Sequence, residues 1–421
     1  MESHPITVDT LQHVGMRASS VLQQARERIQ RPDSQKHPPR FSTASLGAIV
    51  GLDRSQVQTR LSSTTASALQ SLPMGTMLQR RRSFSLAELQ QWARHYRQPF
   101  MRPPGMPAAV ITLAHFKGGS GKTTTAASIA HGLSRLGHKG LVVDADPQGS
   151  LTTLFGLLPD IDIKEEQTLS PLFAGPEYDD NGSYLGPGPS DVEYAIKPTY
   201  WPGIDIVPAA SAMFAAEFHL PARQIKEGAD LQFWRVLDFA LDSCRERYDF
   251  IVIDTPPSLS YITMNALSAA DGIIMPLPPN NLDFASSTQF WTLFGDMQRT
   301  FANRGYEKGW AFNEVLLTRM KPTGHSSSVI QEWVEGAYGT MVSPVQVPDL
   351  EAVRAAAKNF GTVFDSQPVQ EADEQSATPD LQMPIPSTAL PRSFKTAVDA
   401  FERLALHVES RMVTMWRKMG V

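Results

Sequence analysis

The sequence predicts an α/β protein with a mostly parallel sheet, preceded by a smaller basic region of helical character. Three observations carry this prediction. The chain has 421 residues, of which 42% are hydrophobic, so it can form two or three domains around a sizeable core. Apolar runs typical of buried strands alternate with helical stretches. A glycine-rich loop of the phosphate-binding type stands between the first of these runs and a helix.

Composition excludes several classes of protein. Charged residues make up 19% of the chain, which excludes a disordered acidic protein. There is no apolar run of about 18 residues, and the first residues lack a basic segment followed by an apolar one. The single cysteine, Cys244, leaves no internal disulfide and no cysteine-ligated zinc or iron–sulfur site. We therefore expect a cytoplasmic protein.

Charge is divided unevenly along the chain. The total is −5, but residues 1–107 hold 14 lysines and arginines against six acidic residues, a net charge of +8. The remainder therefore carries −13. A basic module on an acidic body indicates a separate partner, for which nucleic acid is the common case, although a solvated basic domain fits the charge equally well.

An amphipathic helix is expected within residues 1–38. Apolar or small residues recur at helical spacing, at Val8, Leu11, Val14, Ala18, Leu22, Ala25 and Ile29. Because the helix precedes any compact domain, we expect it to pack on a second copy of the chain as a dimerisation helix. Packing on its own chain is the alternative.

Residues 39–101 fit a winged helix-turn-helix domain that binds DNA. The segment SLGAIVGLDRSQVQTRL predicts a short helix, a turn at Gly51, an N-cap at Asp53 and a second helix to about Leu61. The second helix carries side chains able to contact phosphates and base edges, namely Arg54, Ser55, Gln56, Gln58 and Arg60. Many helical hairpins share this spacing, so the basic charge is needed to favour DNA.

A basic wing is expected after that second helix. The run Arg80, Arg81 and Arg82 suits a β-hairpin that contacts DNA, and Ser85 with Glu88 forms a capping box for the next helix. A proline-rich linker, 102–107, then leads to a main domain at 108–421.

The most informative motif follows the apolar run Ala108–Phe116, which predicts a buried strand. Strand, glycine-rich loop and helix together form the arrangement that holds phosphate groups against backbone N–H groups and a helix N-terminus. We expect Lys122 to lie at the β- and γ-phosphates and Thr123 to ligate Mg²⁺. The nucleotide-binding residues expected are Lys117, Gly118, Gly119, Ser120, Gly121, Lys122, Thr123 and Thr124.

Two later strands end in carboxylates. The run ending at Asp144 continues Ala-Asp146-Pro-Gln-Gly, and Phe250–Asp254 is an apolar strand that ends in a single aspartate. A carboxylate near a γ-phosphate can orient the attacking water or hold Mg²⁺, and the residues alone leave both roles open.

Further strands and insertions complete the predicted domain. Gly272–Leu277 and Phe312–Thr318 are expected to be buried strands of the same sheet. Asp160–Val192 and Gln367–Met383 are polar, and we expect both to be mobile surface loops.

The loop departs from the ordinary pattern, since Phe116 replaces its first glycine and Lys117 is added. Lys-Gly-Gly-x-Gly-Lys-Thr is the deviant Walker A motif, and the sequence resembles the ParA/MinD family of P-loop ATPases. The resemblance implies that Lys117 reaches the phosphates bound by a partner subunit in a nucleotide-sandwich dimer. It also implies that Asp146 positions the hydrolytic water and that Asp254 holds Mg²⁺ through a water. Asp144, nearby at its strand end, is expected to belong to the same metal site.

Within that family, the preceding helix and helix-turn-helix resemble the longer, type Ia branch with its RepA-type partition proteins of plasmids and secondary chromosomes. The resemblance implies an ATP-bound homodimer that coats nucleoid DNA, a ParB-like centromere-binding partner that stimulates hydrolysis, and repression of the protein's own operon. It covers nearly the whole chain. An iron-protein reductase is excluded because it needs cluster cysteines.

A MinD-like regulator is a competing hypothesis, because members of that group carry a basic amphipathic tail that binds membranes. Here the helical segment Ser393–Met419 contains Asp399, Glu402 and Glu409, which oppose an anionic surface. We expect it to dock on the core, without stable membrane contact.

A second competing hypothesis is a DNA-binding regulator that uses the ATPase only as a nucleotide sensor. The ParA-type interpretation requires contacts between the core and the DNA backbone as well. The candidates are basic residues in the second half of the chain: Arg319, Lys321, Arg354, Lys358, Arg392 and Lys395.

Overall fold

The computed structural model describes most of the chain. The described residues are 7–28, 36–62, 72–78, 81–178, 183–228, 231–321, 325–358, 360–365 and 391–420. Gln367–Met383 and Arg80 lie outside them, so the predictions made for these residues stay predictions.

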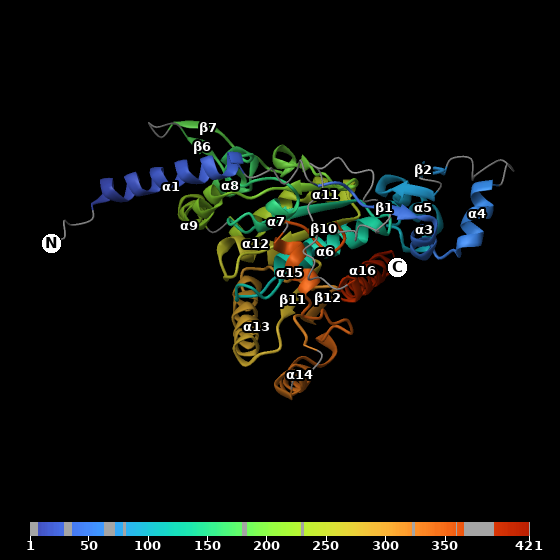
Figure 1. Cartoon of the computed structure of the whole chain (residues 1–421). Coiled ribbons are helices and arrows are strands. Elements are labelled where there is room, and N and C mark those ends of the chain that lie inside the picture. Colours follow the sequence, from blue (N-terminus) through green and yellow to red (C-terminus); the bar gives the residue numbers. More distant parts are fainter. Residues whose placement is uncertain are drawn as a thin grey trace.

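A seven-stranded sheet forms the centre of the main domain (Figure 1). Its strands in chain order are β4 Ala109–Leu113, β5 Gly140–Asp144, β8 Lys197–Pro198, β9 Ile204–Val207, β10 Phe250–Asp254, β11 Gly272–Leu277 and β12 Phe312–Leu317. The order across the sheet is β12-β11-β4-β10-β5-β9-β8, and every neighbouring pair is parallel except β8 with β9. The mostly parallel sheet predicted from the sequence is therefore confirmed.

The register brings the chemically important strand ends together. Asp254 at the end of β10 lies opposite Asp144 at the end of β5 and opposite Leu113 at the end of β4. Because parallel strands share one carboxyl edge, the glycine-rich loop after β4 and both carboxylates are placed at the same edge.

Both faces of the sheet are covered, and its central strands are therefore apolar on both sides. Ile111, Val142 and Val252 join the hydrophobic cluster on one face, whereas Val110 and Ile251 join the cluster on the other. The helices that contribute to the first face are α6 Lys122–Arg135, α7 Ser150–Leu154, α15 Glu351–Lys358 and α16 Pro391–Met419. Those that contribute to the second are α8 Ser170–Ala174, α9 Ala216–Glu227, α10 Val236–Ala240, α11 Asp242–Arg247 and α12 Tyr261–Ala269.

Two further helices lie beside the β11–β12 end of the sheet, α13 Asn281–Ala302 and α14 His325–Tyr338. A two-stranded ribbon, β6 Glu177–Tyr178 with β7 Tyr184–Gly186, lies outside the main sheet. Short 3₁₀ turns complete the fold at Gln98–Phe100, Glu165–Gln167, Glu193–Ala195, Ser211–Ala215, Phe233–Arg235 and Gly339–Met341.

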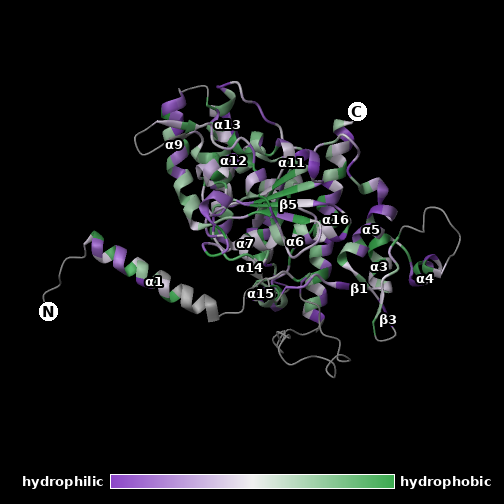
Figure 2. Cartoon of the chain, turned by 90° about the horizontal axis from the view of Figure 1, so that it is seen from above, coloured by the Kyte–Doolittle hydropathy of each residue, from purple (hydrophilic) through white to green (hydrophobic). Residues whose placement is uncertain are grey.

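The predicted C-terminal helix is present as α16, and it docks on the core as expected. Phe401, Leu404, Val408 and Met412 are buried, and Figure 2 shows the helix running beside α6. The apolar stripe of α16 is therefore used inside the chain.

The basic region contains the predicted short helix, glycine turn and second helix. Its elements are β1 Arg40–Ser42, α3 Thr43–Val50, α4 Arg54–Ser62, β2 Thr76–Leu78, β3 Arg81–Ser85 and α5 Leu86–Tyr96. Gly51 closes α3 in the left-handed conformation, with φ 76°, and the Asp53 carboxylate accepts the Gln56 N–H at 2.7 Å to cap α4. The three strands pair antiparallel in the order β1-β3-β2, and the capping box of Ser85 with Glu88 is formed.

The first helix is present as α1 Val8–Arg28 and points away from the body (Figure 2). Val8, Leu11 and Val14 are 70%, 61% and 50% exposed. No described part of the chain covers this apolar stripe, so packing on its own chain is not found among the described residues.

The basic region is attached to the main domain through α5. The Gln90 amide donates to Ser134 Oγ at 2.7 Å, and Arg94 Nε donates to the Gly137 carbonyl at 2.7 Å. Arg97 and His138 both pair with the buried carboxylate of Glu409 on α16. Gly137 is required there, because its φ is 103° and a Cβ would lie only 3.1 Å from that of Ala93.

One expectation is wrong in part. Asp160–Val192, predicted to be a polar mobile loop, contains α8, and Leu169, Leu172 and Phe173 within it are buried. These apolar residues pack with α9 and α10 in the second hydrophobic cluster. Polar segments on both sides of them dominate the composition, which is why the sequence predicted a polar loop.

Candidate functional site

The glycine-rich loop folds around the side chain of Lys122. Gly119 and Gly121 have φ values of 75° and 98°, which lets the chain reverse before α6 begins at Lys122. The Lys122 ammonium donates to the carbonyls of His115 at 3.1 Å and Lys117 at 3.3 Å. Burial lowers the pKa of Lys122, while the Asp254 and Asp146 carboxylates raise it. The ammonium is thus held at the centre of the loop, facing two carboxylates.

Asp254 is the least satisfied polar group in this cluster. It is fully buried, and among the described residues neither carboxylate oxygen has a hydrogen-bond partner. Burial raises its pKa to about 7. The Thr123 hydroxyl lies close enough to lower that pKa but does not complete a hydrogen bond. Buried carboxylate oxygens beside a hydroxyl are donors that Mg²⁺ accepts, so these two residues fit a magnesium site.

Asp144 is engaged differently. One carboxylate oxygen accepts both the N–H and the hydroxyl of Thr152 at 2.7 Å, and the other accepts the Asp146 N–H at 3.2 Å. Burial and the neighbouring Asp254 raise the pKa of Asp144 to about 8. These bonds hold the segment between β5 and α7 in place.

Asp146 lies at the start of that segment, 9% exposed, and accepts the Gln148 N–H at 3.0 Å. It is close enough to Lys122 and Asp254 to act on the pKa of both. The structure therefore brings Lys122, Asp146 and Asp254 together, as the sequence predicts. Of the remaining loop residues, Gly118 and Gly119 are exposed, Ser120 is buried, and Thr124 is half-buried.

Lys117 is bound on the opposite side of the loop. Its Nζ lies 3.0 Å from Asp283 Oδ1, at the start of α13, and the two side chains are 39% and 5% exposed. His115 is buried beside this pair, and its pKa is lowered to about 4, first by burial and then by Lys122. Lys117 is thus exposed enough to move and has a partner within its own chain.

Three contributors to this site were missed by the sequence interpretation: Asp283, Thr152 and Thr318. Asp283 is the third residue after Asn280, whose side chain accepts its N–H at 3.0 Å to cap α13. That N-cap spacing after a predicted strand was visible in the sequence. Thr152 donates to Asp144, and the Thr318 hydroxyl donates to the Ser120 carbonyl at 3.0 Å. Both residues reach the site through tertiary contacts, which no local pattern indicates.

The predicted DNA-contacting side chains of α4 all lie on its exposed side, around the buried Val57. Ser55 and Gln56 also bond to Asp53, at 2.6 Å to its carboxylate and 2.8 Å to its N–H. Arg54, Gln58, Arg81 and Arg82 line a hollow of about 590 Å³ between α4 and the β2–β3 hairpin. A hollow between a helix and a basic hairpin suits a phosphate backbone.

The basic candidates in the core differ in their surroundings. Arg354 is paired with Asp349 and, at 3.0 Å, with Glu351, so its charge is largely balanced. Lys321, Lys358, Arg392 and Lys395 are exposed. Arg319 is also exposed, but it lies beside the glycine-rich loop.

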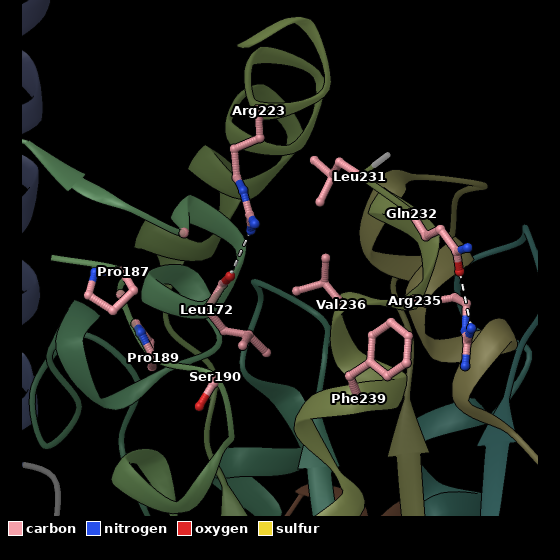
Figure 3. Close-up of a pocket in the computed structure, with 12 residues that line it drawn as sticks. Leu172, Pro187, Pro189, Ser190, Arg223, Leu231, Gln232, Arg235, Val236 and Phe239 are labelled. Carbon is pink, nitrogen blue, oxygen red and sulfur yellow. Dashed lines mark hydrogen bonds between the residues drawn. The ribbon is translucent and has the colours of Figure 1, made fainter. Parts of the chain in front are cut away.

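A separate cavity of about 570 Å³ lies between α9 and α10 (Figure 3). Arg223 and Arg235 stand on opposite sides of it, with Leu172, Val236 and Phe239 between them. Both arginines are already paired, with Glu227 at 2.7 Å and Asp238 at 3.1 Å. None of the predicted site residues lines this cavity, so it is not part of the phosphate-binding site.

The described residues lack two features. They include no helix with the length and hydrophobicity of a membrane-spanning segment. They also contain no cluster of three or more histidine, cysteine or acidic side chains arranged to hold a metal ion. A magnesium site at Asp254 and Thr123 would therefore depend on bound nucleotide for further ligands.

This chain is similar to several known proteins. The family model for the AAA domain matches residues 108–305. A protein from Sinorhizobium fredii named replication protein A is 30% identical over 347 residues, covering 79% of this chain and 81% of that protein. The chromosome partitioning protein ParA of Caulobacter vibrioides is 35% identical over 257 residues, covering 61% and 85%.

Solved structures support the same fold. A partition protein has a TM-score of 0.58 at 19% identity, covering 84% of this chain and 96% of that one. Because 84% of the chain is more than residues 108–421 alone, the match includes part of the basic region. The chain belongs to the ParA family of plasmid and chromosome partition ATPases.

Proposed function

We propose that this ATPase dimerises when it binds ATP, holds DNA without sequence preference, and releases it when a ParB-like partner stimulates hydrolysis. We also propose that its helix-turn-helix represses its own operon and that it works on the nucleoid. The observation that carries the proposal is that α6 connects the phosphate loop to the basic region. The helix begins at Lys122 in the phosphate loop, and the segment directly after it bonds to α5 of the basic region.

Within the nucleotide site, each residue has a separate role. Lys122 and the loop N–H groups bind the β- and γ-phosphates, and Thr123 and Asp254 hold Mg²⁺, directly or through water. The bound cation supplies charge that stabilises the leaving and attacking oxygens. Asp146 orients the attacking water. Because Asp144 is occupied by Thr152, we assign it to holding the β5–α7 segment that carries Asp146, instead of to the metal.

Dimerisation depends on Lys117. Its ammonium is partly exposed and is held by one carboxylate, so it can exchange Asp283 for phosphate oxygens bound by a second subunit. Such a contact exists only while nucleotide and partner are both present, which makes subunit association dependent on ATP. The uncovered apolar stripe of α1 offers a second contact between copies.

DNA binding is assigned to two surfaces. The operator is read by α4 and the hairpin, where Arg54, Gln58, Arg81 and Arg82 line one hollow. Non-specific binding uses exposed basic residues of the core such as Lys321 and Lys358. Two such surfaces in one dimer give avidity that one alone lacks, and their affinity falls steeply with salt.

The experiment that tests this proposal measures ATP hydrolysis with DNA and the ParB-like partner present. Wild type should be stimulated by both, and Lys122→Ala should stay at background. Equal, background-level turnover in both proteins would refute the partition cycle. It would favour instead a DNA-binding regulator that uses the ATPase domain only to sense nucleotide.

A further inference from the structure

We infer that Arg319 is a nucleotide-binding residue, which contacts the base end of the bound ATP, and that it does not belong to the DNA-binding surface. The inference rests on the proposed placement of the nucleotide on the glycine-rich loop. A terminal nitrogen of Arg319 lies 4.0 Å from the position that a Cβ on Gly119 would occupy. The guanidinium therefore lies directly against the exposed backbone of the loop.

The segment that carries Arg319 is bonded to that loop. β12 ends at Leu317, and the next residue, Thr318, donates its hydroxyl to the Ser120 carbonyl at 3.0 Å. Thr318 is 3% exposed, so this bond is protected from water. The residue directly before Arg319 is therefore held against the loop.

The backbone of Arg319 is held in an unfavourable conformation. Its φ is 52°, in the left-handed region that a residue with a Cβ rarely adopts. Bonds on both sides impose this conformation: the Thr318 N–H donates to the Leu277 carbonyl at 3.0 Å, and the Met320 N–H donates to the Val347 carbonyl at 3.1 Å. Strain maintained by its surroundings next to a ligand site indicates a functional position for the side chain.

Sheet order gives the direction in which the nucleotide extends. β10, which ends at Asp254, and β5, which is followed by Asp146, lie on one side of β4, whereas β11 and β12 lie on the other. The terminal phosphate and Mg²⁺ belong on the side of the carboxylates, next to Lys122. The remainder of the nucleotide must then leave the loop toward the ends of β11 and β12, where Arg319 lies.

The chemistry of Arg319 suits a purine base. Its guanidinium is planar and stacks on aromatic rings, and among the described residues no hydrogen bond or ion pair involves it. Arg354, on the nearby segment that follows the Met320–Pro348 bridge, has two acidic partners instead. Arg319 is therefore available to a ligand on the loop.

The test compares binding of Mg²⁺-ATP with binding of Mg²⁺-tripolyphosphate, which has no base, by isothermal titration calorimetry. Arg319→Ala and Arg319→Gly are expected to weaken ATP binding about tenfold and tripolyphosphate binding less than about twofold, if one stacked contact is lost. Arg319→Gly separates the side chain from the backbone, because glycine adopts positive φ freely. Arg299→Ala, at an arginine of α13 whose side chain is 83% exposed, is the control, and it should bind both ligands as wild type does.

Three results would overturn the inference. An equal loss of tripolyphosphate binding would make Arg319 a phosphate contact. Wild-type ATP binding by Arg319→Gly would mean that only the backbone matters. If Arg319→Ala binds ATP as wild type does, but without ATP has a lower affinity than wild type for non-specific DNA, Arg319 belongs to the DNA-binding surface. Lys122→Ala distinguishes the failure of the proposed site: if it binds ATP normally, the nucleotide lies elsewhere and the assignment of Arg319 fails with it.

Discussion

Lys117 is bound within its own chain: its ammonium lies 3.0 Å from Asp283, at the start of the helix that follows β11. The lysine proposed to bridge two subunits is therefore held back, by an ion pair, in the single chain. Association must break this pair, in which Lys117 is partly exposed and Asp283 is buried.

Removal of the Asp283 charge should favour ATP-dependent dimerisation. Asp283→Asn keeps the size of the side chain but releases Lys117, and a partly exposed ion pair contributes about 0.5–1 kcal/mol. The dimer dissociation constant, measured by analytical ultracentrifugation with ATP, should fall roughly two- to fivefold. Lys117→Ala should still bind ATP but remain monomeric. A dimer of unchanged affinity in Lys117→Ala would contradict the role assigned to that lysine.

Asp146 should be needed for hydrolysis and dispensable for binding. Its carboxylate faces Lys122 and Asp254 at the strand ends, so its loss leaves the phosphate loop complete. Phosphate release by Asp146→Ala, measured with DNA and the partner present, should fall about a hundredfold or more. ATP affinity should change little. If turnover persists, another group orients the water.

Arg54 and Gln58 line one hollow but should act differently on the operator. Loss of the charge in Arg54→Ala should weaken binding to all sequences and lower the salt dependence, the slope of log K against log salt, by about 1. Gln58→Ala should instead relax preference at one base pair, by about 1–3 kcal/mol. Fluorescence anisotropy with operator and scrambled duplexes separates the two. Deletion of residues 1–100 should abolish footprints on the operator, and their persistence would refute the helix-turn-helix assignment.

His131 should contribute a loss of stability as the pH falls. Its ring is fully buried against Trp201, with centroids 3.9 Å apart, and burial lowers its pKa from 6.5 to about 4. Between these values the unfolded chain binds a proton that the folded chain does not. Stability is therefore fully present above pH 6.5 and falls, by up to about 1.4 kcal/mol per pH unit, as the pH drops toward 4.

His131→Phe keeps a ring at that position but cannot bind a proton, so its stability should depend less on pH. Denaturant unfolding at pH 7, 6 and 5 measures the two slopes. His115 shifts in the same direction, whereas the raised pKa values of Asp144 and Asp254 act in the opposite direction. The difference between the slopes of wild type and His131→Phe therefore isolates the contribution of His131. His37→Gln, at an exposed position, is the control. Parallel curves for wild type and His131→Phe would show that His131 does not account for acid sensitivity.

The sequence predicted best where its patterns are local. The run from Ala108 through the glycine-rich loop predicted both β4 and the start of α6, because strand burial and phosphate-loop chemistry each impose a residue pattern on consecutive positions. The same holds for the capping box of Ser85, which marks the beginning of α5. In these segments the neighbouring residues alone determine the backbone.

Prediction was weakest where a role depends on tertiary neighbours. Asp144 and Asp146 are two residues apart and chemically identical, yet only Asp144 is taken up by Thr152, which no pattern in the sequence indicates. Arg319 was grouped with surface charges, because its position beside Gly119 arises only when β12 and β4 join one sheet. Composition also concealed α8, since its buried residues are outnumbered by polar ones around them.

The close attachment of α5 to the segment after α6 has a geometric consequence for DNA. A Cβ at Gly137 would lie 3.1 Å from that of Ala93, so α5 packs tightly on this segment, and we expect α4 to keep one orientation relative to the phosphate loop. In a two-fold symmetric pair joined through that loop, the distance between the two α4 helices is set by the joined face. Operator half-sites at that separation would be bound by both subunits together, and half-sites moved by half a helical turn would be bound by only one.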